Sequence, residues 1–325
     1  MKKNLIMILM LFLMLISLKK VNAKGIISDS GFEISYEEIN RLKNIGFSEE
    51  QIYAMEESVF NENKNIVGRV ITQKTRFYKT TIVYNDNSIQ VNSSNSNFNV
   101  INEEISEEEY NSLSIEMNNS ISINRNQPGV ISTEYKQLTS SIIQVGDKYR
   151  LKVDLIWKKM PSQRSSDILT LAHNSLTSPI PNSKYFQQIW VYDNPCQNSS
   201  ERGTSSEGRW KTTVDLYGKV FSLPSDKSCT IPSSNPLVTP IVKTMKIKSL
   251  SSYLYYDINK VTSPVHVIDA YGDYAHAVKK VAIDVAFNFG FDGSKPSAGI
   301  SFTPSLVSSY DEMNTAHAYW DGLNW

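Results

Sequence analysis

The second half of the chain alternates between hydrophobic and polar residues in the way that β-strands do. A hydrophobic residue occupies every second position from Tyr149 to Trp157, and a similar segment runs from Val281 to Phe289. A period of two predicts a strand with one buried face and one wetter face. Weaker strand signals occur at Phe186–Tyr192, Lys211–Phe221, Val242–Lys248, Tyr253–Ile258, His266–Tyr271 and Gly299–Thr303. Because alternation favours antiparallel sheets, we predict that residues 129–325 form an antiparallel β-sandwich.

The pattern between residues 34 and 66 is helical instead. Ser35 and Ser48 are each followed three residues later by a Glu or a Gln, which is the signature of a capping box at a helix start. Gly46 lies between the two segments, where a helix ends most easily on a left-handed residue. The sequence therefore predicts a small N-terminal helical hairpin in front of a mainly β protein.

A hairpin and a polar segment separate the predicted helices from the predicted sandwich. Residues 76–84 are rich in Thr, Tyr, Val and Ile, and a second short strand signal follows at residues 88–91. Residues 92–128 are rich in Asn, Ser and Glu, which predicts an acidic connector with one short helix near residues 105–113. We therefore expect four regions: residues 1–23, 24–91, 92–128 and 129–325.

The first of these regions, residues 1–23, has the pattern of a secretory signal peptide. Lys2 and Lys3 precede an apolar run, and Val21-Asn22-Ala23 resembles a cleavage site. The run from residue 5 to residue 18 is about 14 residues, shorter than the roughly 20 that span a bilayer. We expect cleavage, no stable membrane span afterwards, and a protein that is extracellular or associated with the cell wall. Lys19-Lys20 leaves retention of the segment as an anchor open.

Charge narrows the range of partners. The chain has 33 basic and 33 acidic residues, and removal of the four lysines of the signal segment leaves an acidic excess of four. This balance argues against nucleic acid and against an anionic membrane as electrostatic partners. The distribution is uneven, because residues 24–130 are acidic and residues 131–325 are slightly basic.

Two cysteines, Cys196 and Cys229, follow the signal segment. In an oxidising compartment they can form one disulfide that closes a loop of about 30 residues. Two free thiols are the alternative. Neither cysteine lies in a motif that connects it to a histidine, so we do not assign either one a catalytic role.

Candidate chemistry is sparse. Asp273 and His276 lie close together in the sequence, and His317 is the other histidine that could join them in a hydrolase. The His-Glu-x-x-His spacing of zinc proteases, the Gly-x-Ser-x-Gly elbow and phosphate-binding glycine loops are all absent from the sequence. We therefore expect no metal and no cofactor.

Aromatic residues give a second set of candidates. They gather in Tyr253–Tyr256, in Tyr271–Tyr274 and near Trp320. Exposed aromatic rings on the edge of a β-sandwich can hold sugars or peptides, because they combine rigid apolar area with a polar tip. Tyr255, Tyr271, Tyr274 and Trp320 are the candidate binding residues, and core packing is the alternative explanation for them.

Parts of the sequence resemble secreted proteins of unknown function from Gram-positive bacteria. The resemblance lies in residues 149–161, 270–277 and 316–320, and in the helical region at residues 44–52 and 61–64. It implies secretion by a bacterium. It implies no activity and no catalytic residue.

These observations favour a non-enzymatic extracellular module that binds a surface polymer, a peptide or a protein. A secreted hydrolase that uses His276 and Asp273, with His317, is the alternative. The two hypotheses differ in what the fold must show. The hydrolase requires these three side chains in one cleft. The binding module requires an exposed aromatic patch and fails if Tyr255, Tyr271, Tyr274 and Trp320 are all buried.

Overall fold

A computed structural model describes residues 25–84, 98–116, 130–161, 164, 166–233, 239–261, 263–277 and 310–321. The chain divides into two compact units, Met1–Ile66 and Val67–Trp325. No helix in the described ranges is long and apolar enough to cross a bilayer.

The first unit is helical, as the sequence predicted. Strands β1 (Ile26–Ile27) and β2 (Glu33–Ile34) pair with each other and precede three short helices, α2 (Tyr36–Asn44), α3 (Glu49–Tyr53) and α4 (Glu57–Asn63). Both capping boxes form, from Ser35 to Glu38 and from Ser48 to Gln51. Gly46 has a φ of 83°, the left-handed conformation that a glycine adopts without strain. The structure thus confirms the helical hairpin and adds the separate short helix α4.

The second unit contains a large antiparallel sheet in the order β10-β9-β14-β6-β5-β3-β4, with β8 and β13 also paired to β14. Its strands are β3 (Gly68–Tyr84), β4 (Phe98–Ile105), β5 (Val130–Val145), β6 (Lys148–Lys159), β8 (Thr177–Pro179), β9 (Tyr185–Asn194), β10 (Ser199–Ser205), β13 (Lys227–Ile231) and β14 (Ile241–Lys260). Helix α5 (Glu107–Glu116) follows β4 and packs Tyr110 against Phe77, with ring centroids 4.8 Å apart.

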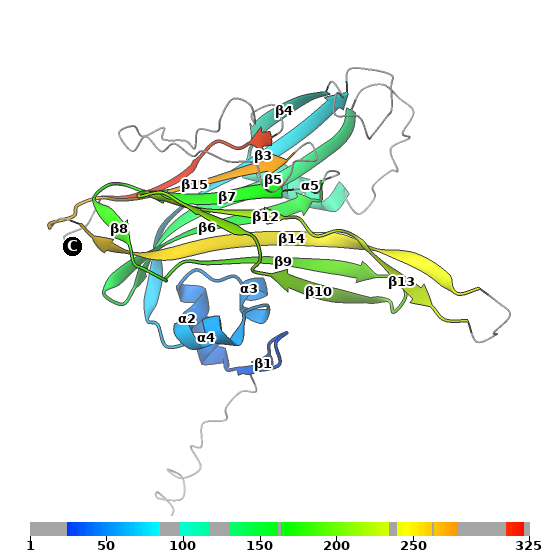
Figure 1. The fold of residues 1–325 in the computed structure, drawn as a ribbon, viewed down its shortest axis with the longest axis horizontal. Coiled ribbons are helices and arrows are strands. Elements are labelled where there is room, and N and C mark those ends of the chain that lie inside the picture. Colours follow the sequence, from blue (N-terminus) through cyan, green and yellow to red (C-terminus); the bar gives the residue numbers. More distant parts are fainter. Residues whose placement is uncertain are drawn as a thin grey trace, which may run out of the picture. The chain divides into compact units, whose positions relative to one another are not determined.

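A smaller antiparallel sheet has the order β11-β12-β7-β15-β16, with β17 paired to β15. Its strands are β7 (Ser166–His173), β11 (Arg209–Thr212), β12 (Leu216–Ser222), β15 (Ile268–Ala277), β16 (Tyr310–Glu312) and β17 (Ala316–Trp320). In Figure 1, β7, β12 and β15 run across the large sheet near β5 and β6.

The two sheets pack face to face around one hydrophobic core. Leu151, Val153 and Leu155 of β6 are fully buried in it. The sheets lie close together at Gly272 of β15, where an added Cβ atom would lie 2.2 Å from the Oγ atom of Ser140. Alternating inward side chains and face-to-face antiparallel sheets confirm the predicted mainly β, sandwich-like fold.

The division of the chain differs from the predicted one. We expected β3 to belong with the helices in residues 24–91, but it pairs with β5 over almost its whole length and belongs to the sandwich. The expected connector contains β4, which pairs with β3, and helix α5, which confirms the short helix. The expected strands at residues 88–91, 281–289 and 299–303 lie outside the described residues.

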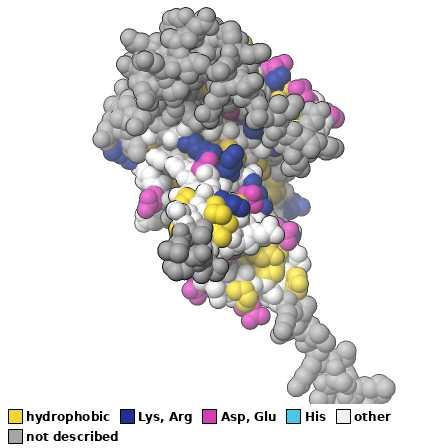
Figure 2. Space-filling view, turned by 90° about the vertical axis from the view of Figure 1, so that its right-hand side faces the viewer, with side chains coloured by type: hydrophobic (Ala, Val, Ile, Leu, Met, Phe, Trp, Pro, Cys, Tyr) yellow, Lys and Arg dark blue, Asp and Glu magenta, His cyan; other side chains and the backbone are white. Residues whose placement is uncertain are grey.

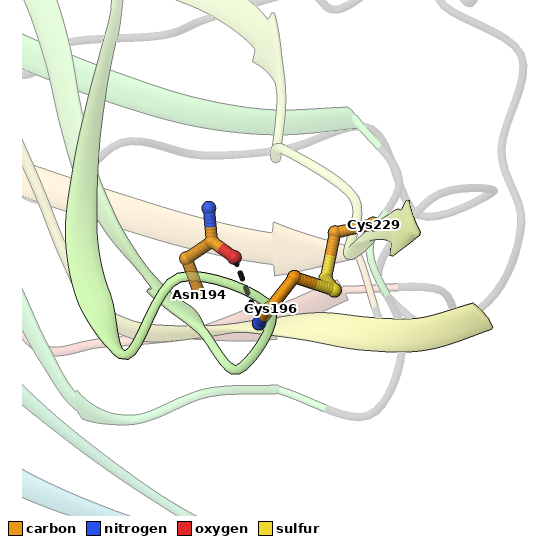
Figure 3. The surroundings of a disulfide bond; sticks show 3 residues. All are labelled: Asn194, Cys196 and Cys229. Carbon is orange, nitrogen blue, oxygen red and sulfur yellow. Dashed lines mark hydrogen bonds between the residues drawn. A yellow bond between two sulfur atoms is a disulfide. The ribbon is translucent and has the colours of Figure 1, made fainter. Parts of the chain in front are cut away.

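The two cysteines form the predicted disulfide. Cys196 lies in the turn after β9, Cys229 lies in β13, and their Cα atoms are 6.1 Å apart (Figure 3). The backbone N–H of Cys196 donates a hydrogen bond to the side chain of Asn194, at 3.1 Å. The disulfide therefore connects the β9–β10 turn to β13.

Candidate functional site

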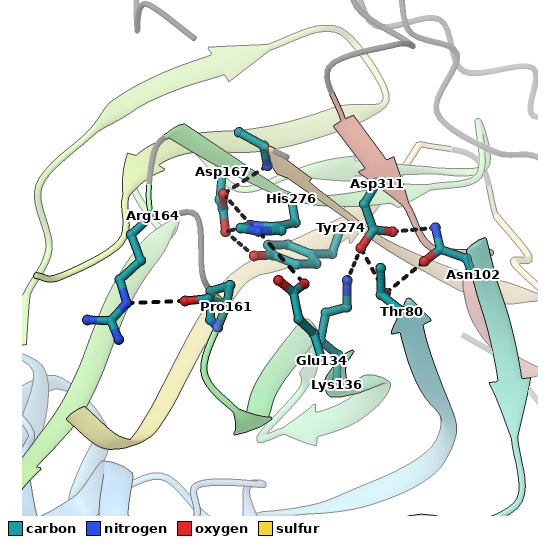
Figure 4. Close-up of polar contacts among 11 residues, drawn as sticks. Thr80, Asn102, Glu134, Lys136, Pro161, Arg164, Asp167, Tyr274, His276 and Asp311 are labelled. Carbon is teal, nitrogen blue, oxygen red and sulfur yellow. Dashed lines mark hydrogen bonds and ion pairs between the residues drawn. The ribbon is translucent and has the colours of Figure 1, made fainter. Parts of the chain in front are cut away.

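A cluster of ionisable side chains, which we call the polar cluster, lies between the two sheets, around His276 of β15 (Figure 4). The Nδ1 atom of His276 is 3.0 Å from Oδ1 of Asp167, which lies opposite it on β7. Its Nε2 atom is 3.9 Å from a carboxylate oxygen of Glu134 on β5. The hydroxyl of Tyr274 donates a hydrogen bond to Asp167. All four side chains are almost completely buried.

A second ion pair continues this cluster. Lys136 of β5 binds Asp311 of β16, and neither side chain has any solvent exposure. Asp311 also accepts hydrogen bonds from the hydroxyl of Thr80, at 2.9 Å, and from the amide of Asn102. The ammonium of Lys136 is 4.9 Å from the centre of the Trp157 ring. Strand alternation places these groups together, because Glu134, Lys136 and the core residue Leu138 share one face of β5.

The surroundings shift the pKa values of these groups in different directions. Burial raises the pKa of Glu134, whose carboxylate has no hydrogen-bond partner among the described residues. Burial lowers the pKa of His276, but attraction to Asp167 and Glu134 outweighs it, and the net pKa is raised. Burial raises the pKa of Asp311, yet the charge of Lys136 brings the net value below normal. The pairs His276–Asp167 and Lys136–Asp311 each place opposite charges together, which lowers the cost of burying them.

The structure does not bring the three predicted catalytic residues together. His276 points between the sheets, whereas Asp273 is three positions earlier on β15 and so lies on the opposite face. Asp273 accepts a hydrogen bond from Thr315, at 3.1 Å. His317 of β17 binds Asp269 instead, with 2.7 Å between Nε2 and Oδ1. The arrangement that the hydrolase hypothesis requires is therefore not formed.

The pair of His317 and Asp269 is the more accessible of the two histidine–carboxylate pairs. About a quarter of the His317 side chain is exposed (24%), and its ring stacks on Tyr271 with centroids 4.2 Å apart. Asp269 also accepts a hydrogen bond from Asn174, at 2.7 Å. No hydroxyl or thiol among the described residues hydrogen-bonds to His317. A base and an orienting acid are present here, and the described residues place no nucleophile in hydrogen-bond contact with the base.

Three of the four predicted aromatic binding residues are buried. Tyr255, Tyr271 and Tyr274 are each at most 5% exposed, and Trp320 is half-buried against Tyr149. Tyr274 serves the polar cluster. Tyr255 has the guanidinium of Arg150 4.1 Å from its ring centre. These rings do not form an exposed patch in this structure.

Two lysines meet at the margin between the sheets and form a different site. Lys219 of β12 comes from the small sheet, and Lys184 comes from the segment that leads into β9 of the large sheet. Lys219 is 4.8 Å from the Trp210 ring and 5.4 Å from the Phe186 ring. Lys184 is 5.2 Å from the same Trp210 ring and 5.0 Å from the Tyr217 ring. We call these five residues the lysine–aromatic site.

Local structure explains why the lysines converge. Trp210 and Lys219 are cross-strand partners in the β11–β12 hairpin, so their side chains share one face. Gly208, with a φ of 119°, brings the chain into β11 so close to Val220 that an added Cβ atom would meet its carbonyl oxygen. On the other sheet, Ser183 fixes the segment before Lys184, because its side chain accepts a hydrogen bond from the N–H of Asp257, at 3.0 Å.

The lysine–aromatic site has cations without anions. Lys219 is only 4% exposed, and neither lysine forms a hydrogen bond or an ion pair with a described residue. Burial lowers the pKa of Lys219, and the charge of Lys184 lowers it further. The aromatic rings offset part of the cost through cation–π attraction. An anion bound between the two ammonium groups would remove the remaining repulsion.

Sequence reasoning overlooked both the polar cluster and the lysine–aromatic site. One signal was present in each case, a charged residue in the inward register of a strand. Lys219 lies on the same face of β12 as Tyr217 and Phe221, and Lys136 lies on the same face of β5 as Leu138. Only the pairing of the sheets shows which other charges lie opposite.

A comparison of the chain with protein-family models and with curated proteins found no match.

Proposed function

We propose that this chain is a non-enzymatic, extracytoplasmic protein that binds an anionic surface polymer at the lysine–aromatic site. One observation carries the proposal: Lys184, just before β9 of the large sheet, and Lys219, on β12 of the small sheet, converge with no acidic partner among the described residues. A buried cation without a counter-ion is costly, and a carboxylate or phosphate group is the chemistry that compensates it.

The proposed attraction for an anion acts at the lysine–aromatic site and does not depend on the net charge of the protein. The acidic excess of the mature chain gives no general attraction for polyanions. Two ammonium groups beside aromatic rings can nevertheless hold one anionic group, and the rings limit the water that competes for the lysines. A polymer that repeats a carboxylate or a phosphate supplies such a group many times. The disulfide and the signal-like first 23 residues support an extracytoplasmic location.

The non-enzymatic part rests on the histidines and their acidic partners. His276 and Asp167 are sealed between the sheets, and His317 has an acid beside it but no nucleophile within the described part of the chain. The hydrolase alternative would need His317. A His317→Ala variant that binds the polymer as the wild type does, with no polymer-cleaving activity in either protein, is the expected result. Cleavage by the wild type that is lost in this variant would overturn it.

Calorimetric titration of the purified, oxidised protein tests the binding site. The probes are oligogalacturonate, which carries carboxylates, polyglycerol phosphate, which carries phosphates, and dextran, which is neutral. We expect binding to at least one of the two anionic probes and no binding to dextran. Equal affinity for dextran, or no binding to either anionic probe, would refute the proposal, and the two anionic arms distinguish the source of the anion.

Lys184→Met and Lys219→Met assign the binding to the site. Loss of a hydrogen bond to a charged group costs about 1.5–3 kcal/mol, which is roughly a tenfold or greater loss of affinity per variant. Lys260→Met, on an exposed lysine at the end of β14, is the matched control and should bind normally. Lys219→Met should fold, because methionine fills a similar volume and removes a desolvated charge. Equal binding by all three variants would place the ligand elsewhere.

Fractionation of the producing cells tests the location. We expect the protein in the medium or the wall fraction, with an N-terminus near residue 24. Recovery in the cytoplasm with residues 1–23 attached would contradict the extracytoplasmic part of the proposal and leave the binding result unaffected.

A further inference from the structure

The β13–β14 hairpin projects from the sandwich beyond the ends of β9 and β10 (Figure 1). We define the arm as Lys227–Ile231 of β13 and Ile241–Met245 of β14, which pair with each other in antiparallel register. The pairing of β9 with β14 stops at Lys246, and Pro195 follows the last residue of β9. Proline has no N–H for a sheet ladder, so β9 does not extend along the arm.

The arm therefore has two free edges. β13 pairs only with β14, and residues 241–245 of β14 pair only with β13, among the strands that the structure describes. Each edge presents alternate N–H and C=O groups that an added strand can satisfy. Ile241 and Val242, both β-branched, are 58% and 66% exposed beside these edges. Such residues favour cross-strand packing in a sheet.

The fold braces this arm at its base. The disulfide joins Cys229 of the arm to Cys196 in the neighbouring turn. Asp226, just before the arm, accepts hydrogen bonds from the N–H of Ile247, at 3.2 Å, and from Arg164, at 2.6 Å. A two-stranded ribbon alone is marginally stable in water, so these ties hold a ribbon that would otherwise fray. A partner then meets a preformed edge and loses less entropy on binding.

Charge indicates the partner. The arm contains Lys227 and Lys243 and no acidic residue, and Lys246 and Lys248 follow it on β14. Lys227 forms an ion pair with Glu201, at 3.4 Å. Lys243 and Lys246 form no ion pair with a described residue. Figure 2, viewed from the side toward which the arm projects, shows Lys and Arg side chains close to hydrophobic ones. Edge-to-edge pairing of two copies would bring lysines together, and edge lysines oppose such self-association.

We infer that the arm is a strand-addition site for an extended, acidic segment of another protein. The free backbone groups match an extended chain, the β-branched side chains match its alternate residues, and the lysines match its Asp or Glu residues. The inference is independent of the anion site, because it uses none of the residues of the lysine–aromatic site.

A library of random 12-residue peptides displayed on phage, selected on the full-length oxidised protein, tests the inference. We expect enrichment of peptides that alternate β-branched and acidic residues. The enriched peptide, made synthetically, should bind at least tenfold more weakly when alternate backbone amides are N-methylated. Failure to enrich any peptide, or equal binding by the N-methylated form, would overturn strand addition.

Paired variants locate the binding. Lys243→Glu on the arm, combined with Lys246→Glu at the base of the arm, should weaken peptide binding tenfold or more, while the protein stays folded. Lys211→Glu combined with Lys260→Glu is the matched control, which reverses two charges outside the arm and should bind normally. The Lys184→Met, Lys219→Met double variant should also bind the peptide normally. Loss of binding in this double variant, with normal binding in the arm variant, would assign the peptide to the anion site and refute the inference.

Discussion

The Lys136→Met substitution gives the sharpest test of the polar cluster. The side chains of Lys136 and Asp311 both have zero exposure, so removal of the lysine leaves a buried carboxylate without its cation. Breaking a buried ion pair from one side costs about 3–5 kcal/mol. The hydrogen bonds from Thr80 and Asn102 remain, which places the expected loss of unfolding free energy near the lower end of this range.

Urea denaturation followed by tryptophan fluorescence measures this loss, and Trp157 lies beside the lysine as a local reporter. The double variant Lys136→Met, Asp311→Asn should recover most of the stability, because no unpaired charge remains. Lys79→Met is the matched control: it breaks an exposed pair with Glu103 on the same sheet and should cost less than about 1 kcal/mol.

Acid provides a second check on the same variant. The charge of Lys136 opposes the effect of burial on the Asp311 pKa, so this pKa should rise when the lysine is removed. Asp311 can then be protonated in the folded protein, and the cost of Lys136→Met should shrink as the pH falls from 7 to 4. A cost below about 1 kcal/mol at pH 7, or no recovery in the double variant, would refute the buried ion pair.

Three further predictions follow from the fold. Because the pKa of His276 is raised in the folded protein, its contribution to stability is fully present below pH 6.5 and is lost as the pH rises through the folded-state pKa. Urea titrations at a series of pH values should therefore show a smaller loss of stability at alkaline pH for His276→Gln than for the wild type. Cys196→Ser with Cys229→Ser opens a loop with a sequence separation of 33. The chain-entropy relation gives a loss of about 3.7 kcal/mol, measurable by thermal unfolding, and an unchanged midpoint would contradict the brace. Gly272→Ala should cost about 1–3 kcal/mol, because its Cβ atom would overlap with Ser140 of the facing sheet, and full stability would argue against this packing.

The sequence by itself determined the local structure of this protein. The two capping boxes and Gly46 predicted helix starts and a helix end, because capping depends on residues within one turn. Alternation predicted the β6 strand and the mainly β class, because side chains on a strand change face at every residue. The two cysteines predicted a disulfide but not its role, since that depends on the position of β13.

Only the tertiary structure decided which residues meet. β3 belongs to the sandwich because it pairs with β5. The sequence could not predict this pairing, because β5 lies far along the chain and pairing at such a distance leaves no local signal. His276 contacts Asp167 rather than Asp273. Residues three positions apart on one strand lie on opposite faces, whereas residues opposite each other on paired strands lie on the same face. Lys184 lies just before β9 and Lys219 lies on β12 of the other sheet. Their charges, which have no acidic partner among the described residues, therefore meet only in the folded protein.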